Sequence, residues 1–121
     1  MANSETILTA QVHNGDSSVQ TVTGDKYKGD GFYSRSDGLH TVQYNLNQFI
    51  GTITIQGTLA TSPTDADYFA VATTTQDSTT GSIIENFTGN YVWVRAVVSN
   101  WTSGAITSIS LNHWHSIDTV L

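Results

Sequence analysis

The segment from Leu39 to Leu59 alternates between apolar and polar residues and is the strongest constraint on the fold of this chain. A period of two predicts half-buried β-strands, because successive side chains of an extended chain point to opposite faces. The gap at Asn47 and Gln48 has the size of a turn and predicts a β-hairpin between residues 40–46 and 49–59. One face of this hairpin is expected to hold Val42, Tyr44, Leu46, Phe49, Gly51, Ile53 and Ile55.

Similar short runs along the rest of the chain predict an all-β protein. Turn signals separate them about every 8–12 residues, which is typical of a sandwich or barrel. We therefore expect residues 1–121 to form a single antiparallel β-sandwich domain, jelly-roll-like, with about eight strands. The further strands are expected at residues 6–12, 19–23, 29–33, 67–74, 83–87, 90–99 and 105–112.

The composition excludes several classes of partner. Four basic residues against ten acidic ones give a net charge of −6, which disfavours nucleic acid and anionic membrane surfaces. No run approaches the roughly 20 apolar residues of a membrane span. Only 12% of the residues are charged, whereas Thr and Ser number 19 and 13. Such a surface can pack against a copy of itself without burying many charges, which suits an assembly subunit.

Motifs for catalysis are not found in the sequence, and we expect no enzyme activity, no cofactor and no metal. Glu5 and Glu85 are the only glutamates, which makes a paired-carboxylate glycosidase improbable. The sequence has neither a phosphate-binding loop nor a nucleophile elbow. His113 and His115 flank Trp114 and would share one face of a strand, so a metal-chelating alternative exists. Two histidines at a strand end are more often simple polar residues.

The run from Tyr91 to Val98 is apolar on both faces, which is typical of a strand covered on both sides. Either a loop covers its outer face, or that face meets another chain. Arg95 lies inside this run and should pair with a carboxylate, Glu85 or Asp67, because buried arginine is rare unless paired. For the second alternative we expect the terminal segments 1–12 and 113–121 to contact neighbouring subunits. The candidate interface residues are Tyr91, Trp93, His113, Trp114 and His115.

Trp101 lies between Asn100 and a stretch of small polar residues that reads as a loop. An exposed tryptophan beside polar groups suits sugar stacking, so Trp101, Asn100 and Tyr33 are candidate glycan-binding residues. The alternative is that Trp101 folds back to cap the core, which is the more frequent fate of a tryptophan.

The segments 38–46, 50–59 and 86–96 resemble small β-rich structural proteins of tailed bacteriophages, especially those of cyanobacterial and other marine phages. The resemblance extends over residues 38–112. It implies a non-enzymatic virion protein and does not assign it to the capsid, the neck or a tail appendage. Together with the weakly charged surface it leads us to expect a capsid decoration (cement) or accessory subunit; the alternative is a tail-appendage module that binds host glycans. We expect its partners to be further copies of itself in a symmetric oligomer such as a trimer, and other virion proteins such as the major capsid protein.

Overall fold

The computed structural model describes residues 4–13, 15–16, 18–29 and 39–113. Nearly all of this part of the chain is extended, and its one helical segment is a single 3₁₀ turn at Asp65–Asp67. No helix in the described residues is long and apolar enough to cross a bilayer. The strands are β1 (Ser4–Leu8), β2 (Gln11–Val12), β3 (Gln20–Thr23), β4 (Tyr27–Lys28), β5 (Leu39–Thr58), β6 (Phe69–Thr88) and β7 (Trp93–His113).

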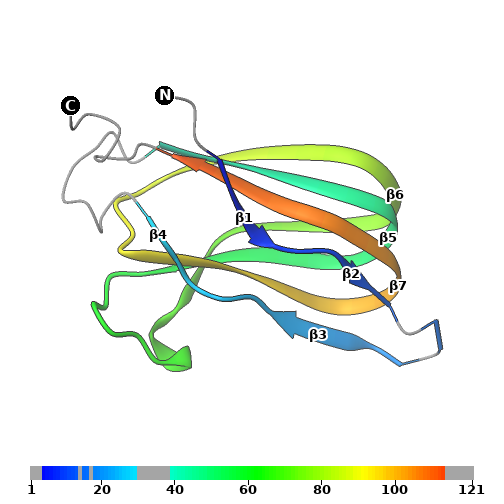
Figure 1. Cartoon of the computed structure of the whole chain (residues 1–121). Coiled ribbons are helices and arrows are strands. Elements are labelled where there is room, and N and C mark those ends of the chain that lie inside the picture. Colours follow the sequence, from blue (N-terminus) through cyan, green and yellow to red (C-terminus); the bar gives the residue numbers. More distant parts are fainter. Residues whose placement is uncertain (1–3, 14, 17, 30–38, 114–121) are drawn as a thin grey trace.

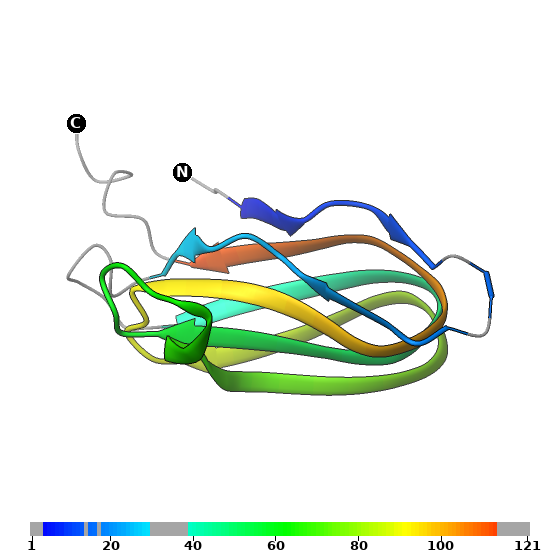
Figure 2. The same ribbon diagram turned by 90° about the horizontal axis from the view of Figure 1, so that it is seen from below.

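Three strands are three to four times the usual length of about 5–6 residues, with 20 residues in β5, 20 in β6 and 21 in β7. Each one bends halfway and continues in the opposite direction in a second layer (Figures 1 and 2). The predicted hairpin is therefore wrong, because β5 runs through Asn47 and Gln48, and its two halves pair with β6 and β7 instead of with each other. The same holds for the strands expected at 67–74 and 83–87, which are parts of β6, and at 90–99 and 105–112, which belong to β7.

The bends of β5, β6 and β7 lie at the same end of the sandwich because each strand has a non-glycine residue with a positive φ angle near its middle. Gln48 in β5, Ser78 in β6 and Asn100 in β7 have positive φ angles of 52°, 56° and 50°. The ladders also shift register here, between Leu46 and Phe49 and again beside Ile50. Bulges of this kind increase strand twist and allow a strand to pass from one sheet to the other. We call this end of the sandwich the bend end.

The pairing order β1-β7-β5-β6 places four antiparallel segments in each layer. The first layer contains, side by side, residues 4–12, 105–113, 39–46 and 79–88, and the second contains 20–28, 93–103, 49–58 and 69–77. Numbered along the chain, these segments have the orders 1-8-3-6 and 2-7-4-5, which define a jelly roll. The predicted fold class, an antiparallel jelly-roll β-sandwich of about eight strands, is confirmed.

The core lies between the two layers and follows the alternation read from the sequence. Val42, Tyr44 and Leu46 point into it from the first layer, and Phe49, Ile53 and Ile55 from the second, all at most 4% exposed. The N-terminal segment contributes as well, since Ile7 and Leu8 are buried against β7. Residues 4–12 are thus part of the chain's own first layer. Whether they also touch neighbouring subunits stays a prediction, as it does for 113–121, of which 114–121 lie outside the described residues.

Candidate functional site

The connection between β5 and β6, residues 59–68, folds over the outer face of the second layer where β7 begins (Figure 2). The indole Nε1 of Trp93 donates a hydrogen bond of 2.9 Å to the carbonyl of Thr61. Arg95 Nη1 lies 2.9 Å from Asp65 Oδ1. A loop therefore covers this strand, which is the first of the two explanations for its apolar outer face.

Arg95 has three partners, one in β5 and two in the connection, which it holds in place. Besides Asp65, its Nε donates to Gln56 Oε1 at 2.8 Å, and its guanidinium lies 3.9 Å from the ring centroid of Tyr68. The Arg95 side chain is 11% exposed, whereas Asp65 is 95% exposed. The ion pair thus joins a largely buried cation to a carboxylate in water, a geometry that contributes little on its own.

The expected carboxylate partners of Arg95 are wrong. Asp67 accepts hydrogen bonds from Thr64 N at 2.7 Å and Thr64 Oγ1 at 3.2 Å, inside the 3₁₀ turn. Glu85 lies on β6 and accepts a 2.7 Å hydrogen bond from the hydroxyl of Tyr44. The sequence indicates that Arg95 needs an anion, but which acid reaches it depends on where the 59–68 connection turns.

A cleft of about 280 Å³ opens beside Arg95, and we call it the Arg95 cleft. One wall comes from residues between β3 and β4, and the other from the 59–68 connection. Burial raises the pKa of the Tyr68 hydroxyl, against the opposing effect of Arg95, so the phenol stays neutral at physiological pH. The lining residues are Thr23, Gly24, Asp25, Lys26, Pro63, Asp65, Tyr68 and Arg95.

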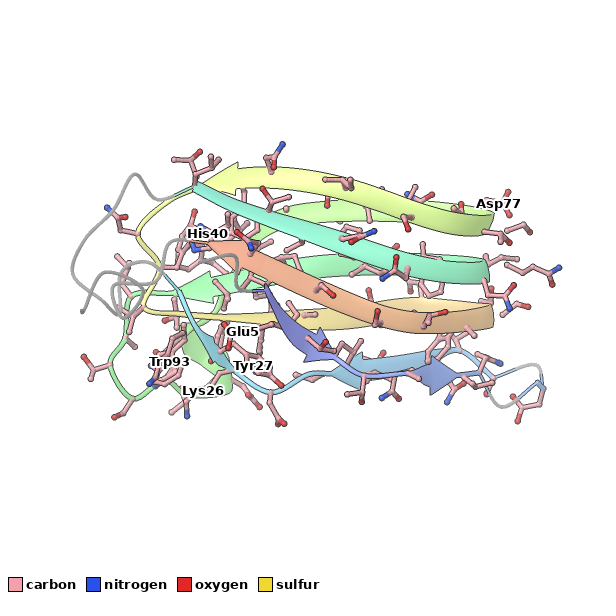
Figure 3. All side chains as sticks on the ribbon, turned by 45° about the horizontal axis from the view of Figure 1, so that its top comes forward. Glu5, Lys26, Tyr27, His40, Asp77 and Trp93 are labelled. Atoms are coloured by element: carbon pink, nitrogen blue, oxygen red, sulfur yellow. The ribbon has the colours of Figure 1, made fainter. Side chains whose placement is uncertain are left out.

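The basic residues that the structure describes lie at this end of an acidic protein, where Asp25 and Asp65 also line the cleft. Among the described residues, the lysines and arginines are Lys26, Lys28 and Arg95, and all three lie on or beside the first residues of β7. The ammonium of Lys26 sits 4.9 Å from the ring centroid of Trp93, a cation–π contact. Figure 3 shows Lys26, Tyr27 and Trp93 together, far from Asp77 at the bend end. The arrangement offers aromatic rings and cations side by side.

Of the two alternatives for Trp101, the exposed one is wrong. Trp101 is inside β7 and only 1% exposed, with its Nε1 donating to the carbonyl of Ser103 at 2.9 Å. His13 meets the indole edge-on at 5.6 Å between ring centroids, and Phe49 lies at 6.0 Å. The alternative in which the indole caps the core is the one observed. No face of Trp101 is open to a sugar.

The other predicted site residues are not brought together. Asn100 is exposed at the bend end, and Tyr33 lies outside the described residues. Tyr91 is half-buried and packs near His40, Phe87 and Phe69, with ring centroids 5.7 to 6.2 Å apart. The backbone of His113 pairs with His40 at the end of β7, whereas Trp114 and His115 lie outside the described residues.

A larger hollow of about 330 Å³ lies at the bend end. Backbone of the bends forms much of its surface, and Asp16 is the one lining residue with a charge. Hydrogen bonds from the hydroxyl and amide of Ser18 lower the pKa of Asp16. This carboxylate is therefore already used in the turn between β2 and β3, and the Arg95 cleft is the better candidate for binding.

Sequence reasoning identified Arg95 but missed Lys26, Asp65 and Tyr68. These residues are 27 to 69 positions away from Arg95 along the chain. They meet it because β4 pairs with the start of β7 and because the 59–68 connection folds back. The available signal was the scarcity of basic residues. Because the chain has only four, the sequence could have raised the question of whether they lie close together.

No family model and no curated protein sequence matches this chain. Similar solved structures exist at low sequence identity. The SPBc2 prophage-derived protein YomS aligns with a TM-score of 0.52 at 12% identity, over 93% of this chain and 94% of YomS. The C-terminal CBM6 of LamC, a marine laminarinase from Zobellia galactanivorans, aligns with a TM-score of 0.51 at 13% identity, over 91% and 99%. At these identities the similarity establishes the jelly-roll sandwich.

Proposed function

We propose that this chain is a non-enzymatic structural subunit of a bacteriophage particle. In the finer form of the proposal it decorates the capsid as a symmetric oligomer attached to the major capsid protein. The observation that carries the proposal is a jelly roll whose outer faces bear ladders of hydrogen-bonded, uncharged polar side chains and whose core is only partly covered along one edge strand, β6.

The outer surface supports this assignment through its hydrogen-bond ladders. Thr41 donates to Asn86 at 2.6 Å, and Asn45 joins Ser108 at 2.9 Å. Side chains that already hydrogen-bond one another need less compensation when another protein covers them, because few charges and few unpaired polar groups are desolvated. A surface of this kind therefore suits permanent contact with other virion proteins.

The similarity to YomS, described as a prophage-derived protein, also supports a phage origin. It agrees with the resemblance of residues 38–112 to structural proteins of tailed phages.

The proposal is tested by electron cryo-microscopy of the phage particle that carries this chain. Copies arranged regularly over the shell are expected for a decoration protein. Copies confined to the tail would replace the capsid role with an appendage role, and a particle without the chain would overturn the proposal.

The Arg95 cleft favours a second function, binding of an acidic glycan. Lys26 is exposed beside the Trp93 ring, and Tyr68 adds a second aromatic ring. Aromatic faces pack against sugar rings, and a cation attracts a uronate or sulfate in a protein that is otherwise acidic. The similarity to the CBM6 of LamC, a module from a laminarinase, supports this reading.

Polygalacturonate and neutral laminarin are the probes for this function. We expect the purified chain to bind polygalacturonate more tightly, and both K26Q and Y68A to weaken that binding about tenfold or more. D77N, at the opposite end of the sandwich, serves as the control and should bind normally. Equal affinity for the two polymers, or binding unaffected by K26Q, would contradict this function.

A further inference from the structure

We propose that the β6 edge is a self-association surface, at which two copies of this chain pair their β6 strands antiparallel about a two-fold axis and extend both layers at once. This inference deepens the self-association in the proposed function and rests on it.

The first observation is that β6 is an edge strand over its whole length. Among the described residues it pairs only with β5, so both halves present one unpaired backbone edge (Figure 1). Natural edge strands are usually protected by lysine, proline or covering loops. The 20 residues of β6 contain no lysine, arginine or proline.

The second observation is that the core is incompletely covered along this edge. Side chains that face inward from β6, among them Ala72, Gln76 and Ile83, are only partly buried. On the opposite side of the sandwich the inward residue Ile7 is 1% exposed. A second copy at β6 would close the core as β1 does at the other edge.

The third observation is a symmetry within β6 itself. Positive φ angles occur at Ser78 and Gly81, so the bend is centred between Thr79 and Thr80. A two-fold axis at this centre places Ser78 of one copy opposite Gly81 of the other. The bends of the two copies then coincide, and residues 69–77 of one copy run antiparallel to residues 82–88 of the other.

This register also places inward side chains opposite inward side chains. It places Ala72 opposite Phe87, Gln76 opposite Ile83 and Thr74 opposite Glu85. Thr74 Oγ1 accepts a hydrogen bond from Gln76 Nε2 at 2.6 Å, which leaves its hydroxyl proton free to be donated. Glu85, which accepts from Tyr44 within its own chain, can accept this second donor from the partner copy.

Charges do not oppose this pairing. The two acidic residues of β6, Asp77 and Glu85, face Ser82 and Thr74 of the partner copy, so no like charges meet. Shifting the register by one residue would place inward side chains opposite outward ones, which a two-layer sandwich does not accommodate. The register is therefore specified by the sequence of β6.

The test uses the pair Thr75 and Ile84, which face each other across copies in this register. Both side chains point outward and are exposed, and within one chain they lie on opposite layers. We expect T75E/I84K to form a dimer in analytical ultracentrifugation, because each copy's Glu meets the other's Lys. T75K/I84K and T75E/I84E place like charges opposite each other at two symmetric positions, and their dissociation constants should be at least about tenfold higher.

All three variants are substituted at the same two positions. Comparing their unfolding midpoints shows whether a difference in dimerisation comes from unequal folding stability. A wild-type chain that is monomeric at all concentrations would overturn the inference. A dimer that is equally stable in all three variants would overturn it too, because association would then use another surface. Particle binding is measured separately: a β6 dimer that attaches to no particle leaves this inference intact and removes the proposed function.

Discussion

The indole of Trp101 fills the bend end of the core, where the two layers are joined by the curved strands. Replacing it with alanine leaves a large cavity that the short bends cannot close. We expect W101A to lower the free energy of unfolding by about 3–5 kcal/mol. Urea denaturation measures this loss, with T102A as an exposed neighbour that should stay within about 0.5 kcal/mol of wild type. A loss below about 1 kcal/mol for W101A would contradict the buried position.

Tyr44 is the buried residue whose ionisation should affect stability. Burial first, and then the hydrogen bond and negative charge of Glu85, raise its pKa far above the ordinary value of 10.0. Because the folded state holds the proton more tightly, the stabilisation is complete below pH 10.0. It is lost progressively above that value, as the unfolded tyrosine ionises and the folded one does not.

The measurement is the free energy of unfolding between about pH 8 and 11 for wild type and Y44F. Below pH 10 we expect Y44F to be less stable by about 1 kcal/mol, because Glu85 loses a hydrogen-bond donor. Above pH 10 the gap should narrow, since phenylalanine has no proton to lose. A constant gap over the whole range would show that Tyr44 does not carry this linkage.

At the scale of the elements, the bend of β7 requires glycine at one position, because the backbone of β5 lies directly against it. Gly104 has a φ of +87°, and a Cβ placed on it would lie 2.1 Å from the carbonyl oxygen of Gln48. Gly81 in β6 has a φ of +118°, but its Cβ would meet nothing within 4 Å. The two positions therefore separate backbone strain from a steric clash between strands.

We expect G81A to lose about 1 kcal/mol, the strain of a left-handed alanine. G104A should lose clearly more, about 2 kcal/mol or above, because two backbones must also move apart. Thermal unfolding of both variants provides the comparison. Equal losses would mean that β5 and β7 do not touch at this bend.

At the scale of the whole molecule, the sequence predicts which residues face the core better than it predicts how strands connect. The period of two identified the residues between Val42 and Ile55 that face the core. These residues are the same whether the chain forms a hairpin turn at Gln48 or bends there into the second layer. A turn and a bend use the same local signals, and only the partners of each half distinguish them. Those partners lie 12 to 73 positions away, so the hairpin could not be excluded from local pattern.

The candidate site was harder to predict for a related reason. The polar neighbours of Trp101 left its exposure open, because its burial depends on residues far away in the sequence: Phe49 from the adjacent strand of the same layer and His13 beyond β2. The Arg95 cleft combines residues from three separate parts of the chain, so no motif within one segment predicts it. Sequence reasoning found the need of Arg95 for an anion because that follows from the residue type alone.

The pairing of β1 with β7 has a consequence for biosynthesis. Ser4 pairs with Asn112, so β1 lies beside a strand that is synthesised about 100 residues later. Both layers have β7 between β5 and the N-terminal strands, and neither layer can close before β7 has emerged. Contacts of such long range fold slowly. A nascent chain must therefore leave its N-terminal strands unpaired until β7 has been synthesised, so β1 to β4 join the sheet only after β5, β6 and β7 exist.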